Sequence, residues 1–272
     1  MRLFTLASLI FFFISIPARA GAADGKSQLG DEVRAIQQKY SIVGLSAVAV
    51  KNGSVLWHTN FGLADIDRQL PVTDKTKFRI ASISKTITTT ALMQLWEKGK
   101  FKLDDDISSF LGWRIANPAF PDKPITFRQL LTHTSSLMDN ANYDRFLKLT
   151  YDSAGQAPDI REILNIDGAC YNNGANFTTN APGEKYLYCN LAFGLAGTLV
   201  EKISGQRFDI YCSKNILKPL GMNASFNVAS LPDFNDIVVL YEIENDEFKP
   251  QADNLRGVRP ENQVGSEYGA DG

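Results

Sequence analysis

Histidine and cysteine are scarce in this sequence. Its 272 residues include only two histidines and three cysteines, and no two cysteines form a C-x-x-C pair. A zinc site built from these ligands is therefore not expected, and neither is a fold held together by several disulfides. The cysteines, Cys170, Cys189 and Cys212, allow one internal disulfide at most, and the sequence does not determine which pair would form it.

An excess of basic residues is also missing. Lysine and arginine total 28 against 30 aspartate and glutamate residues, so the formal net charge is −2. A nucleic-acid partner, which needs a basic face, is therefore not expected. The chain is 44% apolar, which is enough to form a core and excludes global disorder. Beyond the N-terminus, no apolar run approaches the ~20 residues of a transmembrane helix.

The N-terminus is typical of a secretory signal peptide. One arginine precedes a mostly apolar run over residues 3–16, and an Ala-Arg-Ala cleavage motif follows. This pattern predicts that residues 1–20 are a signal peptide and that residues 21–272 form the mature domain, in the periplasm or outside the cell. An uncleaved anchor helix is the alternative, although the run is shorter than a bilayer span.

The mature sequence predicts a mixture of helices and strands. An amphipathic helix is expected over residues 28–40, and an Asn52-Gly53 turn favours a hairpin of strands 44–50 and 54–62. Further helical patterns cover residues 82–98, a capped segment from Thr126, residues 190–204 and residues 211–217. Residues 140–180 predict long loops with a short helix near 160–164, and residues 238–244 predict a strand. This order indicates an α/β (α+β) fold with an antiparallel sheet lobe and a helical lobe.

The tetrapeptide S-I-S-K, from Ser82 to Lys85, is the sharpest chemical signal. A serine at the start of a helix shares one helix face with a lysine three residues later. The amine can take the hydroxyl proton when burial or nearby cations lower its pKa, and the serine then becomes a nucleophile. By itself the tetrapeptide is weak evidence, because a capping serine followed by a solvated lysine gives the same letters.

The segment Tyr188-Cys189-Asn190 supplies a second element. In an extended segment, residues two positions apart point to the same side, so we expect Tyr188 and Asn190 to face the site and Cys189 to point into packing. A phenol near an ammonium group has a lowered pKa and can relay a proton between a serine and a leaving group. The Asn190 amide can bond both the lysine and a substrate carbonyl.

These segments together resemble the serine β-lactamase and penicillin-binding protein superfamily, in the branch of class C β-lactamases, D-alanyl-D-alanine carboxypeptidases and esterases. The resemblance runs in order from about Val43 to Met222. Besides S-x-x-K, its motifs are the glycine-led hairpin, GKFKLDD at residues 99–105, LLTHTSSL at residues 130–137 and the P-G and Y-x-N groups of residues 182–190. The resemblance implies a β-lactamase/transpeptidase-like fold.

The resemblance also implies a role for each site residue. Ser82 is then the acylated nucleophile and Lys85 the proton acceptor beside it. Tyr188 is the base or proton relay, and Asn190 contacts Lys85 or the acyl group. The Ser82 backbone N–H is one oxyanion-hole donor, and no metal or organic cofactor is needed. The implied activity is that of an exported serine hydrolase acting on a β-lactam, a D-Ala-D-Ala peptide from peptidoglycan, or a small ester.

Three other residues receive specific expectations. His133 would be the base of a Ser-His-Asp triad, but no G-x-S-x-G elbow is present and we expect a structural role for it. His58 is expected at the surface of the hairpin. Ser136 stands where the family usually has glycine, and if that position needs a positive φ the serine costs about 1 kcal/mol.

The end of the sequence departs from the family pattern. After Tyr188, no lysine or histidine is followed two residues later by glycine, so the K-T-G or H-x-G strand is absent. We therefore expect a C-terminally incomplete domain with its last sheet strands missing and a hairpin edge left open. Losing one of two oxyanion donors costs roughly 10²–10³ in rate. The alternative function is accordingly an impaired remnant, or a ligand- or peptidoglycan-binding protein of the same fold.

Overall fold

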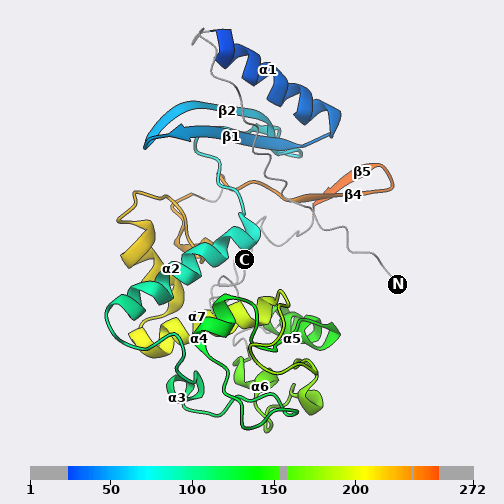
Figure 1. The fold of residues 1–272 in the computed structure, drawn as a ribbon. Helices are drawn as coiled ribbons and strands as arrows, with labels where there is room; N and C mark the ends of the chain where they lie inside the picture. Colours follow the sequence, from blue (N-terminus) through cyan, green and yellow to red (C-terminus); the bar gives the residue numbers. More distant parts are fainter. Residues whose placement is uncertain (1–23, 153–157, 234–235, 251–272) are drawn as a thin grey trace. The chain divides into compact units, whose positions relative to one another are not determined.

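A computed structural model describes residues 24–152, 158–233 and 236–250 of the chain (Figure 1). The expected signal peptide and the C-terminal residues after 250 lie outside these ranges, so the expectations for both remain predictions. The chain divides into two compact units, residues 1–74 and residues 75–272. Within the described ranges, no helix combines the length and the apolar composition that crossing a membrane requires.

The first unit contains one helix and a three-stranded antiparallel sheet. Its elements are α1 (Asp24–Lys39), β1 (Gly44–Lys51), β2 (Ser54–Asp65) and β3 (Leu70–Pro71), and the strand order is β1-β2-β3. Asn52 and Gly53 have φ angles of 52° and 74°, the positive values that a type I′ turn requires, so the predicted hairpin is confirmed. In the described part of this unit, β1 pairs with β2 alone and leaves its other edge open.

The second unit is mainly helical and also contains a small hairpin. Its helices are α2 (Ser84–Glu97), α3 (Ser108–Leu111), α4 (Phe127–Leu131), α5 (Ala141–Asp152), α6 (Arg161–Leu164), α7 (Asn190–Ser204) and α8 (Phe208–Cys212). The hairpin pairs β4 (Tyr241–Glu244) with β5 (Glu247–Pro250) in antiparallel fashion. The predicted mixture of antiparallel sheet and helices is thus confirmed (Figure 1).

Helix α7 forms the centre of the helical unit. Every residue from Leu191 to Val200 is buried, as expected for a helix that is apolar on all sides. Helix α2 packs against it, and Ala91, Leu92 and Leu95 are the apolar residues that α2 buries. Gly205, with a φ of 68°, ends α7 in the left-handed conformation that glycine adopts readily.

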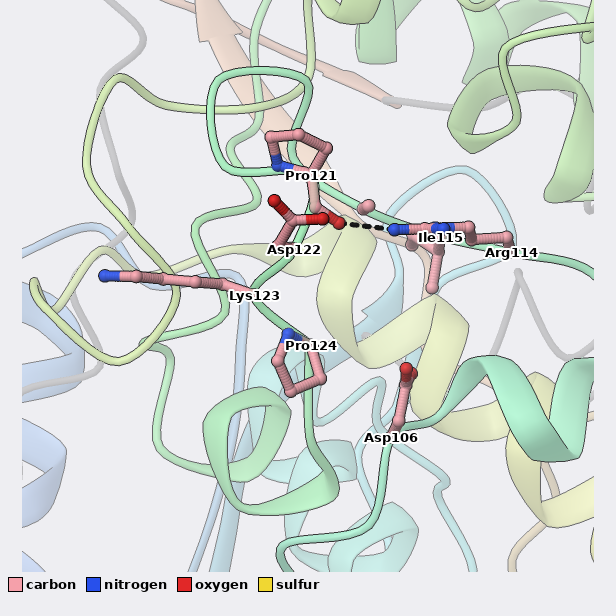
Figure 2. Close-up of a pocket in the computed structure, with 8 residues that line it drawn as sticks. Asp106, Arg114, Ile115, Pro121, Asp122, Lys123 and Pro124 are labelled. Carbon is pink, nitrogen blue, oxygen red and sulfur yellow. Dashed lines mark hydrogen bonds between the residues drawn. The ribbon is translucent and has the colours of Figure 1, made fainter.

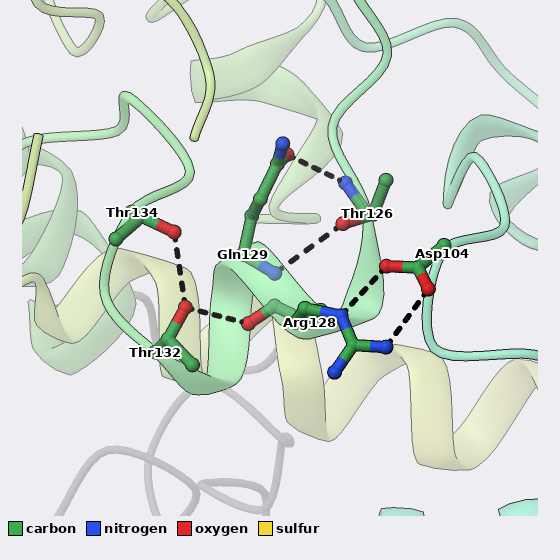
Figure 3. A network of polar contacts seen from close by, with 6 residues as sticks. All are labelled: Asp104, Thr126, Arg128, Gln129, Thr132 and Thr134. Carbon is green, nitrogen blue, oxygen red and sulfur yellow. Dashed lines mark hydrogen bonds and ion pairs between the residues drawn. The ribbon is translucent and has the colours of Figure 1, made fainter. Parts of the chain in front are cut away.

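A capping box starts α4, as the sequence predicts (Figure 3). The Thr126 hydroxyl accepts a hydrogen bond from the Gln129 N–H at 3.3 Å, and the Gln129 side-chain oxygen accepts one from the Thr126 N–H at 3.0 Å. Two backbone donors that the helix itself leaves unpaired are thereby satisfied. On the exposed side, the Arg128 guanidinium makes a bidentate ion pair with Asp104 at 2.7 and 2.8 Å.

The predicted long loop over residues 140–180 is wrong in its first part, where α5 forms. Asn140 caps this helix, because its side-chain oxygen accepts the N–H groups of Asn142 at 2.9 Å and Tyr143 at 3.2 Å. Tyr143 and Phe146 are 5% and 1% exposed and pack into the core. The helix signal in the sequence was a capping asparagine followed by two aromatic residues three positions apart. The polar residues between these aromatics made the segment look like a loop.

Two other boundaries also differ from prediction. The strand expected over residues 238–244 begins only at Tyr241, and the buried Val238 donates its N–H to the Lys77 carbonyl rather than to β5. It is followed by β5, which was not predicted. The helix expected over residues 211–217 begins earlier, at Phe208, and ends in a π-helical turn over Ser213–Leu217.

All three cysteines are free thiols, so no disulfide pair forms. Cys189 and Cys212 are completely buried, and Cys170 is half-buried. Burial raises the pKa of the Cys189 thiol well above its ordinary value and that of Cys212 to about 12. The thiolate is the reactive form, so both buried cysteines are chemically protected in the folded chain.

Candidate functional site

Ser82 lies in a short 3₁₀ turn, Ala81–Ile83, directly before α2. The sequence placed the helix start at Ser82, and the structure begins the α-helix two residues later, at Ser84. The Ser82 side chain remains exposed at this junction. Because the positive end of the α2 dipole lies here, negative charge developing on the serine oxygen is favoured.

Lys85 reaches back from the first turn of α2 to the serine. Its ammonium nitrogen lies 3.1 Å from the Ser82 hydroxyl oxygen and 2.9 Å from the side-chain oxygen of Asn190. Lys85 is only 6% exposed, so these contacts form with little competition from water. The structure therefore brings three of the four predicted residues into one hydrogen-bonded chain, although Asn190 lies 105 positions from Lys85.

Tyr188 joins this group through its ring. The Lys85 ammonium nitrogen lies 5.1 Å from the centre of the Tyr188 ring, within the range of a cation–π contact. Within the described residues, the Tyr188 hydroxyl makes no hydrogen bond to Ser82 or Lys85, and the residue is 42% exposed. The ring also packs on that of His133, with 4.4 Å between centres. Tyr188 is therefore adjacent to the serine–lysine pair but not bonded to it.

The backbone around Cys189 explains how Tyr188 and Asn190 come to share a side. Cys189 is extended, with φ −145° and ψ 118°, and its side chain is completely buried in the core. Since successive side chains of an extended segment alternate, its two neighbours point the other way. The predicted alternation is confirmed.

Asp139 is a residue that the sequence analysis missed. Its carboxylate accepts hydrogen bonds from the N–H groups of Asn190 at 2.7 Å and Leu191 at 3.0 Å, and from the Cys189 thiol at 3.3 Å. It thus caps the first turn of α7 from 51 positions away. The signal available in the sequence was indirect: the residue before α7 is a cysteine, which is a weak helix cap.

His133 has the structural position that the sequence predicted for it. Its Nδ1 accepts the N–H of Cys189 at 3.2 Å, so the proton of the neutral ring lies on Nε2. Its backbone carbonyl accepts the N–H of Leu187 at 2.8 Å. Burial lowers the pKa of His133 below its ordinary value, and the charge of Lys85 lowers it further, while Asp139 opposes this shift.

Protonation of His133 removes the Nδ1 lone pair that accepts the Cys189 N–H, so we expect the chain to lose stability in mild acid. The folded-state pKa of His133 lies below that of the unfolded chain, so protonation favours unfolding. The stabilising contribution is complete above about pH 6.5 and decreases as the pH falls below that value. Urea unfolding between pH 7.5 and pH 5 should show a shallower pH dependence for His133→Asn than for the wild type, because the Asn side-chain oxygen can replace Nδ1 as the acceptor.

Asparagine also suits the backbone at this position, where φ is 55°. His58→Asn is the matched control, because His58 is exposed on the hairpin, as the sequence predicted. This control variant keeps His133 and its bond to Cys189, so it is expected to retain the acid sensitivity that this bond causes. An unchanged pH dependence in His133→Asn would show that His133 does not contribute to acid sensitivity.

Ser136 occupies the strained position that its departure from the family pattern predicted. Its φ is 63°, in the left-handed region, and the residue is buried. The serine hydroxyl accepts a hydrogen bond from the Asn117 side chain at 3.1 Å, a contact that glycine could not make. The strain is therefore accompanied by a buried hydrogen bond.

A separate pocket of about 260 Å³ lies elsewhere in the helical unit (Figure 2). Its charged side chains are Asp106, Arg114, Asp122 and Lys123. Two of them already serve the fold, because Arg114 donates to the carbonyl of Pro121 and Asp106 accepts the N–H of Ser108. None of the four predicted site residues lines this pocket, so it is separate from the group around Ser82.

The chain is similar to several known proteins. The chain is 28% identical over 222 residues to Protein flp of Staphylococcus aureus (strain N315), covering 81% of this chain and 42% of that protein. It is 31% identical over 180 residues to Penicillin-binding protein 4* of Bacillus subtilis (strain 168), covering 65% of this chain and 36% of that protein.

Among solved structures, the octameric penicillin-binding protein homologue from Pyrococcus abyssi is similar, with a TM-score of 0.68 and 26% identity. The similarity covers 90% of this chain and 52% of that one. The chain therefore spans about half, or less, of the length of these relatives. The family described as Beta-lactamase matches residues 29–263, which is most of the chain. The chain belongs to the Beta-lactamase family.

Proposed function

We propose that this chain acts as a serine hydrolase through an acyl-enzyme formed on Ser82. The observation that carries the proposal is the position of the Lys85 ammonium group, which bonds both Ser82 and Asn190. A buried amine on a serine hydroxyl is an arrangement that activates a nucleophile. Membership of the Beta-lactamase family and the similarity to penicillin-binding proteins support a serine hydrolase activity.

In the proposed acylation step, Lys85 acts as the neutral amine: the Ser82 oxygen bonds to the substrate carbonyl carbon, and its proton passes to the Lys85 nitrogen, which becomes the ammonium and can hand the proton on through Tyr188. The carbonyl oxygen becomes an oxyanion, which the Ser82 N–H in the turn directly before α2 stabilises. The bond to the leaving group then breaks, and the leaving group takes the transferred proton. Water then attacks the carbonyl carbon of the acyl-enzyme and gives a proton to Lys85 or Tyr188, the bond to the Ser82 oxygen breaks, and that oxygen takes the proton as the acid product leaves.

Tyr188 is proposed as the proton relay to the leaving group. Its ring lies 5.1 Å from the Lys85 nitrogen, and the proposal requires its hydroxyl to move onto the reacting atoms when substrate binds. Catalytic hydrogen bonds are often long in unliganded enzymes and shorten when substrate binds. Asn190 is proposed to hold Lys85 through its side-chain oxygen and to contact the substrate carbonyl through its NH₂ group.

The proposed substrates are a β-lactam, a D-Ala-D-Ala peptide or a small ester. All three present a carbonyl carbon with a leaving group to the serine, which is the chemistry that the Ser82–Lys85 pair can perform. The signal-peptide pattern of residues 1–20 supports export to the periplasm or beyond the cell, where peptidoglycan peptides are found.

Covalent labelling tests this proposal directly. The purified chain is incubated with a fluorophosphonate and, separately, with a fluorescent penicillin, and intact mass spectrometry measures the adduct. We expect labelling of the wild type and of Ser84→Ala, and no labelling of Ser82→Ala. Ser84 is the matched control because it belongs to the same tetrapeptide.

Equal labelling of the wild type and Ser82→Ala would exclude Ser82 as the nucleophile. Reversible penicillin binding without any adduct would instead support the binding-protein alternative.

A further inference from the structure

We propose that Asp139 is a positioning residue for the reaction at Ser82. This inference rests on the proposed function and adds a residue outside the S-x-x-K and Y-x-N segments. Asp139 is proposed to act through Asn190, whose side chain holds Lys85 beside the serine. It is not proposed to touch the substrate.

The Asp139 carboxylate holds the start of α7 with three contacts. Oδ2 accepts the N–H of Asn190, and Oδ1 accepts the N–H of Leu191 together with the thiol of Cys189. The first N–H groups of a helix have no partner within the helix, and a carboxylate beside them is also favoured by the helix dipole. The local cap is weaker, because the Cys189 sulfur accepts the N–H of Ala192 at 3.4 Å.

Fixing this turn also fixes the Asn190 side chain. Asn190 is the first residue of α7. Its backbone N–H donates to the Asp139 carboxylate at 2.7 Å, the shortest of the three contacts. The Asn190 side-chain oxygen then lies 2.9 Å from the Lys85 nitrogen, which lies 3.1 Å from the Ser82 oxygen. A displacement of the first turn therefore moves Lys85 relative to its target, and a misplacement of about 1 Å can cost roughly 10²-fold in rate.

Asp139 is itself held in place by the residues beside it. Met138 donates its N–H to the Asn176 carbonyl at 2.9 Å, and the Met138 carbonyl accepts from the Asn176 side chain at 3.0 Å. On the other side, Asn140 caps α5. The carboxylate thus projects from a fixed point between two bonded neighbours, which is what a positioning residue requires.

The experiment measures the covalent step separately from probe binding. Fluorophosphonate labelling is followed over time at several probe concentrations for the wild type, Asp139→Ala, Asp139→Asn and the exposed control Asp104→Asn. We expect Asp139→Ala to lower the maximal labelling rate 10- to 100-fold with little change in the half-saturating probe concentration. Asp139→Asn should recover part of the rate, because its remaining oxygen still accepts one N–H group. Asp104→Asn should label at the wild-type rate.

A purely structural role for Asp139 would lower the unfolding midpoint and leave the labelling rate of the folded protein unchanged. Measurements well below each midpoint distinguish the two roles. If Asp139→Ala does not fold, Asp139→Asn alone decides between them. A folded variant that labels at the wild-type rate would overturn the inference.

A second measurement does not depend on acylation. Acetylation of lysines by an N-hydroxysuccinimide ester, read by peptide mass spectrometry, reports how firmly Lys85 is held. We expect labelling of Lys85 to rise severalfold in Asp139→Ala, whereas exposed Lys100 should not change. If the wild type forms no adduct at Ser82, the proposed function fails and acetylation of Lys85 alone decides the inference. Unchanged acetylation would overturn it.

Discussion

Lys85→Met is expected to lower the rate of Ser82 acylation by roughly 10³-fold, within the ~10²–10⁴ range of general acid–base contributions. The Lys85 nitrogen lies 3.1 Å from the serine oxygen, and its side chain is buried against α7. Methionine keeps much of the apolar stem and removes the amine, so packing is largely preserved while the proton acceptor is lost. The measurement is the time course of fluorophosphonate labelling.

Lys100→Met is the matched control for this change, because Lys100 is exposed shortly after the end of α2. It should label as fast as the wild type. Circular dichroism and a thermal transition establish that Lys85→Met is folded before its rate is interpreted. If folded Lys85→Met is labelled at the wild-type rate, a group other than Lys85 accepts the serine proton.

Leu92→Ala is expected to lower the free energy of unfolding by about 3 kcal/mol. Leu92 is completely buried in the core that α2 shares with α7. Removing its side-chain carbons loses transfer free energy and leaves a cavity, and such substitutions cost roughly 2–5 kcal/mol. Domains are typically stable by about 5–15 kcal/mol, so this change removes a large share of the total. Urea unfolding followed by circular dichroism measures it.

Leu220→Ala is the matched control, because it removes the same side-chain atoms from a residue that is 68% exposed and lies outside the core. Its effect should stay within about 0.5 kcal/mol. Equal losses in the two variants would show that the α2–α7 packing does not dominate stability. Leu92 lies on the same face of α2 as Lys85, which is seven positions earlier, and both residues are buried.

The elements that the sequence predicted well have local signals. The Asn52-Gly53 turn, the Thr126 capping box and the apolar length of α7 each depend on residues a few positions apart. Helix α5 was missed because its two core aromatics are separated by polar residues. Strand β5 was missed because its turn, Asn245-Asp246, lacks the glycine that usually marks such turns, although both residues have positive φ.

The arrangement of the candidate site was likewise predicted only where its signals are local in the sequence. The serine–lysine spacing is local to one helix turn, and the alternation of Tyr188 and Asn190 is local to one extended segment. Their meeting at Lys85 depends on tertiary packing, and only the family resemblance predicted it. Lys85 contacts the Tyr188 ring rather than its hydroxyl, and this ring also packs at a tilt of 32° on the ring of His133. Asp139 was missed because no local pattern links a carboxylate to a helix start 51 residues away.

The buried Cys189 thiol provides a built-in reporter of the site's integrity. It lies between Tyr188 and Asn190 and donates to Asp139, so a reagent can reach it only when the segment carrying both residues opens. Alkylation of Cys189 under native conditions therefore measures the opening free energy of that segment without any substrate. Cys212, buried in α8, gives a second reading from the same sample, and the ratio of the two rates distinguishes local opening from global unfolding.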